Sequence, residues 1–568
     1  MKHISRSITL GFALAGAATA GVQEQQVIPP QHVISPESSC SETQEGAFTQ
    51  HGFEDCLAKQ AMSIFYPEDE EYAPMIYPYN LRIPIYPKAV VVPEDAQGVS
   101  LAVRCGHQCG LKVQPRSGGH SFGNFGLGGK DGQLVISMQN FQDEIEIDEQ
   151  GIAKVGTGYR LGNVALSIYE KGKRVLAHGT CPGVGVGGHF THGGNGYSSR
   201  RYGLAVDQIV GLDVVTADGA IVYASEKQNR ELYWALRGAA DSFGIITTFY
   251  LQTSPAPENV VWYSIRANMD ILKNETQFVH YFEHMQNFAQ NATIVDRNLG
   301  MGMYYDNWNH HLYGTYFGSE EHFRENIWPS MRDAYLLEPQ SIVIASVSWP
   351  ESLQNLAEKV PLQQPKFGYD MASNFHSTAL TIPSTNLVTR DAWVNYFNYI
   401  QTLPNIADDG VGWFGMLGLE GGPDSQVQRK DRDENFAAYH RKDKFWDFLH
   451  YSYVPDETTP QDFPLWSIEV ADGLTAAIMD AMPSAEFGMY MNHVDPTLNK
   501  EEVIKYYYGG ETLYTRLQKA KAVWDPEEVF WNPQSIAPAP RSRSGWSKLG
   551  LGNVFRTLQI APSIVPEL

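Results

Sequence analysis

The stretch Arg116-Ser-Gly-Gly-His-Ser-Phe-Gly-Asn-Phe-Gly-Leu-Gly-Gly129 places six glycines in fourteen residues around one nucleophile, His120. This much glycine is unfavourable in a core helix or strand, but it lets the backbone take positive φ angles and approach a ligand closely. Successive backbone N–H groups in such a loop can form a concave anion nest that suits phosphate. The alternative is an ordinary glycine-rich loop with an exposed histidine, and this segment alone leaves both interpretations open.

A second nucleophile has the same kind of neighbours, in Cys181-Pro-Gly-Val-Gly-Val-Gly-Gly-His189. Two such sites in one half of the chain indicate a large planar ligand that is held from two sides. The glycines loosely resemble a dinucleotide fingerprint. That match is weak, because neither the strand–turn–helix frame nor the later acidic residue is clear.

Two other site types are less compatible with these segments. Cys181, His189 and His192 lack the ligand spacing of a closed zinc site, and no carboxylate is near, so we expect no metal. The string Gly119-His-Ser-Phe-Gly123 has the form Gly-x-Ser-x-Gly. A nucleophile elbow needs a helix directly after the serine, whereas more glycines follow here, which disfavours a serine hydrolase.

The first twenty residues have the pattern of a secretory signal. A basic start precedes a short apolar run at 8–17, and Ala18-Thr-Ala20 fits the small-residue cleavage pattern. The mature chain is therefore predicted to begin at Gly21 and to be secreted. Sequons at Asn274 and Asn291 are consistent with an extracellular glycoprotein.

Composition limits the partners. The chain has 568 residues with a formal net charge of −22, which argues against nucleic acid because phosphate binding needs basic patches. The N-terminal apolar run is too short to span a bilayer, and no other long apolar stretch follows, so we expect no membrane partner. An odd cysteine count of five leaves one cysteine unpaired or otherwise engaged, and Cys181 is the outlier by position and context.

The order of expected elements is typical of an α+β protein. Short β-branched runs between glycine turns predict strands at 89–92, 134–137, 154–156, 209–215 and 243–248, with helices at 95–109 and 161–171. A second region, richer in aromatics, predicts helices at 271–287, 320–335 and 387–402 and a strand at 410–417. A last helix is predicted at 512–523, before Asp525-Pro526.

Taken in order, these segments resemble the berberine-bridge-enzyme-like flavoproteins of the vanillyl-alcohol-oxidase class. The closest likeness is to secreted fungal oligosaccharide oxidases. The resemblance extends over about 56–536. It rests on the two glycine-rich segments and on Gly193-Gly-Asn-Gly196, Tyr202-Gly-Leu-Ala-Val-Asp207, Leu232-Tyr-Trp-Ala-Leu-Arg-Gly238, Phe243-Gly-Ile245, Tyr507-Tyr-Gly509, Leu517-Gln-Lys519 and Asp525-Pro-Glu-Glu-Val-Phe530.

The resemblance implies a PCMH-type FAD-binding domain of two α/β subdomains, plus a substrate domain whose antiparallel sheet is backed by helices. The implied parts are a signal peptide at 1–20, an N-terminal segment at 21–80, the FAD-binding domain at 81–255, the substrate-binding domain at 256–490, a C-terminal return to the FAD-binding domain at 491–540, and a tail at 541–568.

The resemblance also implies a bicovalent FAD, with His120 on the flavin 8α-methyl carbon and Cys181 on ring carbon C6. It further implies a Cys56–Cys105 disulfide, which leaves Cys40–Cys109 as the remaining pair. The residues implied to bind the cofactor are His120, Cys181, Arg116, Ser117, Gly118, Gly119, Ser121, Phe122, Gly123, Gly185, Gly188, His189, Gly193, Gly196, Ile245 and Asn532.

The implied reaction is hydride transfer from a hydroxylated carbon to flavin N5, with electrons passed to oxygen to give hydrogen peroxide. In Tyr490-Met-Asn-His-Val-Asp495, His493 stands where the family motif has its proposed base, a tyrosine. Tyr490, Asn492 and His493 are the predicted catalytic residues. Since free histidine has a pKa of about 6.5, flavin reduction is predicted to slow below that pH. The alternative is that His493 is only a polar wall of the pocket.

Phe122, Met416 and Trp413 are the predicted substrate contacts. Phe122 and Met416 stand where the sugar-oxidising relatives carry tyrosine and glutamine. Because a sugar site needs dense hydrogen bonding, these residues favour a phenolic or secondary-metabolite substrate. One alternative is an oligosaccharide oxidase that makes lactones, and another is an inactive flavin-fold binding protein. The expected partners are a small-molecule substrate and oxygen, and the expected state is a monomer.

Overall fold

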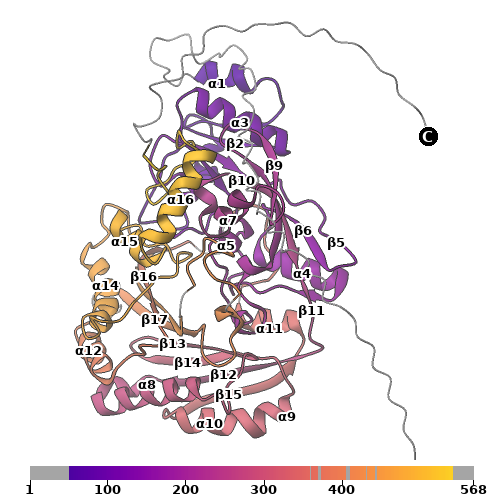
Figure 1. Cartoon of the computed structure of the whole chain (residues 1–568). Coiled ribbons are helices and arrows are strands. Elements are labelled where there is room, and N and C mark those ends of the chain that lie inside the picture. Colours follow the sequence, from indigo (N-terminus) through magenta and orange to yellow (C-terminus); the bar gives the residue numbers. More distant parts are fainter. Residues whose placement is uncertain are drawn as a thin grey trace, which may run out of the picture. The chain divides into compact units, whose positions relative to one another are not determined.

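The computed structural model describes residues 50–358, 360–368, 372–404, 410–429, 431–441 and 444–540 (Figure 1). The predicted signal peptide, Cys40 and the predicted tail at 541–568 lie outside these residues. In the part that is described, no helix has both the length and the apolar character that a membrane crossing requires.

The first sheet has four strands in the order β1-β2-β4-β3, with β4 parallel to both β2 and β3. Every residue of β2 and β4 is buried, as is typical of parallel strands covered on both faces. Because β3 ends at Arg116, the first glycine-rich loop begins at the carboxyl end of this sheet. The strands are β1 (Ser63–Phe65), β2 (Ala89–Val92), β3 (Val113–Arg116) and β4 (Leu134–Ser137).

Helices α1 (Gln50–Leu57) and α3 (Ala96–Gln108) pack with this sheet in one hydrophobic cluster. Asp95 caps α3 by accepting a hydrogen bond from the backbone N–H of Gly98. A disulfide joins Cys56 on α1 to Cys105 on α3, which confirms the implied pairing. Cys109 is also disulfide-bonded, and its implied partner lies outside the described residues.

The second sheet has five antiparallel strands in the order β5-β6-β10-β8-β9. Its strands are β5 (Glu146–Ile147), β6 (Ile152–Gly156), β8 (Ile209–Val215), β9 (Ile221–Ser225) and β10 (Ile245–Gln252). The helices of this part of the chain are α2 (Tyr72–Met75), α4 (Leu161–Gly172), α5 (Val186–Thr191), α6 (Ser199–Tyr202) and α7 (Arg230–Ala239). A short ladder joins β7 (Arg174–Val175) to β11 (Ser254–Pro255).

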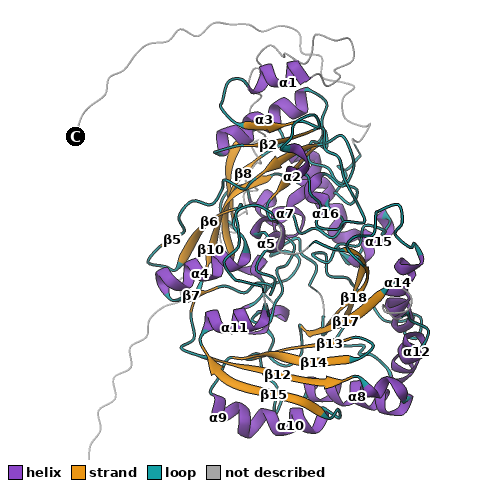
Figure 2. Cartoon of the chain, turned by 180° about the vertical axis from the view of Figure 1, so that it is seen from behind, coloured by secondary structure: helices purple, strands orange, loops and turns teal. Residues whose placement is uncertain are grey.

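The third sheet is antiparallel throughout, with seven strands in the order β15-β12-β14-β13-β17-β18-β16 (Figure 2). Its strands are β12 (Val260–Asn268), β13 (Leu299–Tyr305), β14 (Asn309–Tyr316), β15 (Pro339–Val347), β16 (Asn374–Ile382), β17 (Gly412–Leu419) and β18 (Trp446–Val454). This arrangement confirms the α+β fold class and the antiparallel substrate sheet that the resemblance implied.

Helices share a single hydrophobic cluster with this sheet, so one face of the sheet is covered. The helices that contribute to it are α8 (Glu275–Gln290), α10 (Trp328–Ala334), α12 (Arg390–Ile400) and α14 (Trp466–Met479). The helix predicted at 320–335 is instead interrupted, because a π-helical turn at Phe323–Ile327 separates α9 (Glu320–His322) from α10. The short helix α11 (Trp349–Leu356) belongs to a separate small cluster.

The chain returns to the first part after the third sheet. Helices α15 (Lys500–Tyr506) and α16 (Glu511–Trp524) pack in the same cluster as β8 and α7. Phe530 forms a parallel bridge with Val113 of β3. This return carries the segment that contains His493 to the glycine-rich loops.

Candidate active site

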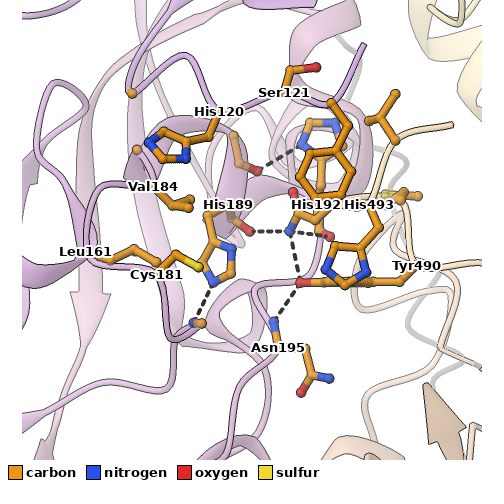
Figure 3. Close-up of a pocket in the computed structure, with 18 of the residues that line it drawn as sticks. His120, Ser121, Leu161, Cys181, Val184, His189, His192, Asn195, Tyr490 and His493 are labelled. Atoms are coloured by element: carbon orange, nitrogen blue, oxygen red, sulfur yellow. Dashed lines mark hydrogen bonds between the residues drawn. The ribbon is translucent and has the colours of Figure 1, made fainter. Parts of the chain in front are cut away.

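One cavity of about 430 Å³ is lined by both glycine-rich loops, by strands β17 and β18 and by the returning segment (Figure 3). It brings together most of the residues that the sequence singles out. Those that line it are Ser117, Gly118, Gly119, His120, Ser121, Phe122, Cys181, Gly185, Gly188, His189, Gly196, Met416, Tyr490, Asn492 and His493.

The two glycine-rich loops touch each other. A Cβ atom on Gly185 would lie 2.0 Å from the backbone nitrogen of Gly118, so neither position has room for a side chain. The Ser117 hydroxyl accepts a hydrogen bond from the N–H of Gly187 and donates one to the carbonyl of Thr157. This contact is why His120 and Cys181, which are far apart in sequence, face one cavity.

His120 and Cys181 are suited to act as nucleophiles here. Burial, and then the charges of Arg160 and Arg116, lower the pKa of His120 to about 3. Its imidazole is therefore neutral near neutral pH and keeps a nitrogen lone pair. Cys181 is exposed and lines the same cavity. The pair can attach one planar ligand at two points.

His493 lies flat against Phe122, with ring centroids 5.6 Å apart and planes 3° from parallel. Its Nδ1 atom is buried and has no hydrogen-bond partner among the described residues. Burial lowers the pKa of His493 to about 4. The imidazole is therefore neutral across the usual working range and can accept a proton.

Tyr490 and Asn492 hold the returning segment in place. The Tyr490 hydroxyl oxygen accepts hydrogen bonds from the backbone N–H of Asn195 at 2.8 Å and from Nδ2 of Asn492 at 3.0 Å. Asn492 also donates to the carbonyls of His189 and His192, each at 3.0 Å (Figure 3). Burial raises the pKa of Tyr490, so this residue keeps its proton. Both side chains position His493 against the loops.

Beside His493 the wall on the sheet side is largely apolar. Met416 of β17 pairs with Leu449 of β18, and both line the cavity. Phe122 meets Phe375 edge to face at 5.1 Å, and Phe375 stacks on Tyr451 at 4.6 Å. Phe122 and Met416 therefore both line the cavity, and their role as substrate contacts stays a prediction.

Trp413 does not line the cavity, although the sequence predicts it as a substrate contact. Its side chain is 2% exposed and belongs to the helix-covered core. Its indole N–H donates to Asn307. Met416, three residues on, has the opposite parity in the strand, so the two side chains point to opposite faces of β17.

Five residues implied to bind the cofactor lie behind the cavity wall rather than on it. Arg116 donates to the carbonyls of Met75 and Tyr77. The Nδ2 group of Asn532 donates to the Asp241 carboxylate, which itself lines the cavity. The other three are Gly123, next to the ring of Phe125, Gly193, packed on Tyr439, and Ile245, in a core cluster.

Two acidic residues in the cavity lining were missed, Asp241 and Asp447. Asp241 pairs with His192 at 3.4 Å. Burial opposes a charge on His192, but its hydrogen bond to Asp241 raises the pKa of the imidazole. Strand alternation in Trp446-Asp-Phe-Leu-His-Tyr451 could have grouped Asp447 with Leu449, although it could not show which face lines the cavity.

Similarity to known proteins extends over most of the chain. Residues 87–225 match the family model described as "FAD binding domain", and residues 489–537 match "Berberine and berberine like". A carbohydrate oxidase of Microdochium nivale is 34% identical over 86% of this chain and 96% of that protein. A xylooligosaccharide oxidase of Thermothelomyces thermophilus is 32% identical over 86% and 94%.

A solved structure has the same fold over nearly its full length. It is a glucooligosaccharide oxidase from Acremonium strictum, with a TM-score of 0.78 and 30% identity, and the match covers 86% of this chain and 99% of that one. That enzyme contains a 6-S-cysteinyl, 8α-N1-histidyl FAD.

Proposed function

The chain belongs to the berberine-like family of FAD-linked oxidoreductases, and on that premise we propose that it oxidises a hydroxyl group of a carbohydrate. The observation that carries the proposal is a single cavity in which His120, Cys181 and His493 meet. Relatives named for carbohydrate and xylooligosaccharide oxidation favour this substrate over the phenolic one that we expect first from the sequence.

The cavity fits a flavin that is attached twice. The glycine loops leave the His120 imidazole and the Cys181 thiol facing the same space, and His120 is neutral as an attacking nitrogen must be. We propose that His120 bonds to the 8α-methyl carbon and Cys181 to ring carbon C6. When bound, the flavin accepts a hydride and passes electrons on to oxygen.

His493 has the position and protonation state of a general base. As a C–H bond of the substrate gives up its hydride, the adjacent hydroxyl must lose a proton, and the neutral imidazole accepts it. The substrate carbon is thereby oxidised to a carbonyl. Tyr490 and Asn492 take no proton in this scheme and keep His493 at the cavity wall.

The test is hydrogen peroxide release from the purified holoenzyme with cello-, xylo- and chito-oligosaccharides. We expect turnover on at least one series, together with a fluorescent flavin band after denaturing electrophoresis. A colourless protein without that band contradicts the flavin proposal. A yellow protein that oxidises no sugar contradicts the carbohydrate proposal alone.

A second candidate substrate is a hydroxylated aromatic compound, because Phe122, Met416 and Leu449 form an apolar wall beside His493. Anaerobic bleaching of the flavin distinguishes the two classes in one assay. Bleaching by phenolic alcohols and by none of the sugars selects the aromatic class. Attached flavin that no compound in either panel reduces favours an inactive binding protein.

We further propose that the protein acts outside the cell, on the strength of the predicted signal peptide. Amino-terminal sequencing of the protein recovered from culture medium is expected to start at Gly21. Protein that remains inside the cell contradicts this location without affecting the proposed chemistry.

A further inference from the structure

Asp447 is a carboxyl group that the scheme above does not use. It is the second residue of β18 and pairs with Gly418 of β17, and both residues line the cavity. A Cβ atom added to Gly418 would meet only the backbone oxygen of Asp447, at 3.8 Å. The missing side chain at Gly418 therefore leaves an open niche beside Asp447.

The carboxyl of Asp447 lacks a complete set of partners. Its Oδ1 atom is buried and has no hydrogen-bond partner among the described residues. The other carboxylate of the described lining, Asp241, already binds His192 and Asn532. A buried polar atom without a partner is costly, so a ligand in the niche is the natural source of the missing hydrogen bond.

Two buried charged residues, Glu420 and Lys444, affect the pKa of Asp447. Glu420 is 1% exposed, and neither of its carboxylate oxygens has a hydrogen-bond partner among the described residues. Lys444 is also buried and donates to the Tyr439 hydroxyl at 3.0 Å. Burial and then Glu420 raise the pKa of Asp447 far above its ordinary value, while Lys444 opposes that change. Both effects favour the protonated form of Asp447, and a carboxylic acid can both donate and accept a hydrogen bond.

The side chains around Asp447 determine which substrates it can favour. Its neighbours on the same wall, Met416 and Leu449, offer no strong hydrogen-bonding atoms, so a substrate hydroxyl on this side has Asp447 as its partner. We propose that Asp447 binds a hydroxyl or ring oxygen of the substrate in the Gly418 niche, and so selects polyhydroxylated substrates. This inference rests on the proposed carbohydrate oxidation.

Three variants of the holoenzyme test it, with the oligosaccharide that the wild-type protein oxidises best. Asp447→Leu removes the hydrogen bond and should raise KM at least about 10-fold with kcat changed less than about 3-fold, because a binding contact common to ground and transition states is lost. Asp447→Asn, the matched control, keeps a donor and an acceptor and should hold KM within about 3-fold.

Gly418→Val fills the niche with a side chain and leaves the carboxyl group of Asp447 in place. Because Gly418 has ordinary φ and open space at its Cβ position, this variant should fold even if Asp447→Leu does not. We expect the same rise in KM, with the flavin spectrum and melting temperature unchanged. A KM near the wild-type value in Gly418→Val, or in well-folded Asp447→Leu, overturns the inference.

The outcome also separates this inference from the proposed function. If the wild-type protein oxidises no sugar, binding of cellotriose, xylotriose and chitotriose is measured from the change in flavin absorbance. Binding that weakens in Gly418→Val retains the niche as a sugar site and rejects only the oxidation. A wild-type protein that neither oxidises nor binds these sugars rejects both.

Discussion

At the scale of single residues, His493 is the proposed base of the cavity. Its ring is fixed between the face of Phe122 and the edge of Tyr490, with centroid distances of 5.6 and 4.9 Å. These contacts bury one ring nitrogen and leave the imidazole neutral. Burial lowers the pKa of His493, so the imidazole stays unprotonated and can accept a proton.

Replacing His493 by Phe should slow flavin reduction by about 100-fold or more, because a positioned base contributes at least that factor. The phenyl ring preserves the stacking on Phe122, and neither proposed attachment residue is changed. The measurement is anaerobic stopped-flow reduction with the flavin spectrum as the control for attachment. Near-normal reduction in this variant would place the base elsewhere.

The pH dependence of reduction follows from the pKa of His493, which burial lowers to about 4. The base is the neutral form, which persists above that pH and is lost below it. Reduction should therefore be flat from about pH 7 to 5, fall to about half near pH 4, and approach a tenfold fall per unit only below that pH. The expected fall therefore lies at a lower pH than the 6.5 of the free imidazole.

The control for this profile is His493→Tyr, which restores the residue type of the family motif. A tyrosine ionises near pH 10 in water, so its profile should shift upward. Identical profiles for the wild-type protein and this variant would show that another group controls the rate.

At the scale of elements, contact between two loops builds the site. The first loop follows the parallel strand β3, and the second precedes helix α5, so each begins or ends at a rigid element. Their closest approach is at Gly118 and Gly185, where backbone meets backbone. Glycine is needed at both positions for this approach, because neither has room for a side chain.

Gly185→Ala tests this contact, because its methyl group would lie 2.0 Å from the Gly118 nitrogen. Forced separation of packed backbones should cost about 1–3 kcal/mol of unfolding free energy and lower the fraction of covalently bound flavin. Gly188→Ala is the matched control, since its Cβ meets nothing within 4 Å. Chemical denaturation gives the stabilities, and equal values for both variants would contradict the role of the loop contact.

At the scale of the whole described unit, the cavity depends on elements far apart in sequence. The loop after β3 of the first sheet supplies His120, and the loop between β7 and α5 supplies Cys181. The third sheet supplies Met416, and the returning segment supplies His493. Neither cysteine of the disulfide between Cys56 and Cys105 lines this cavity. Stability and catalysis should therefore be separable.

A Cys56→Ala/Cys105→Ala double variant should lose about 2–4 kcal/mol of unfolding free energy, since a cross-link restricts the unfolded chain. Its anaerobic flavin reduction rate should match that of the wild-type protein, because neither cysteine lines the cavity. Denaturant titration and stopped-flow reduction measure the two effects. A reduction rate that falls together with the stability would refute this separation.

Local pattern was enough to predict several elements. The runs at Ala89–Val92, Leu134–Ser137 and Ile209–Val215 form strands with the predicted bounds, because β-branched side chains between glycine turns favour extended backbone. The helix predicted at 271–287 begins later, at Glu275. There the Asn274 side chain accepts a hydrogen bond from the N–H of Gln277 and caps the first turn. Hydrophobic periodicity does not reveal such a hydrogen bond between side chain and backbone.

The nucleophiles were also accessible from sequence, because the chemistry of His120 and Cys181 lies in their own side chains and in their glycine neighbours. The positions of Trp413 and Asp447 relative to the cavity could not be predicted from the sequence. Strand alternation sorts residues into two faces, but it does not say which face is covered by helices and which lines a cavity. That choice depends on α12 and α14 packing on one side of the third sheet and the glycine loops on the other, contacts between residues hundreds of positions apart.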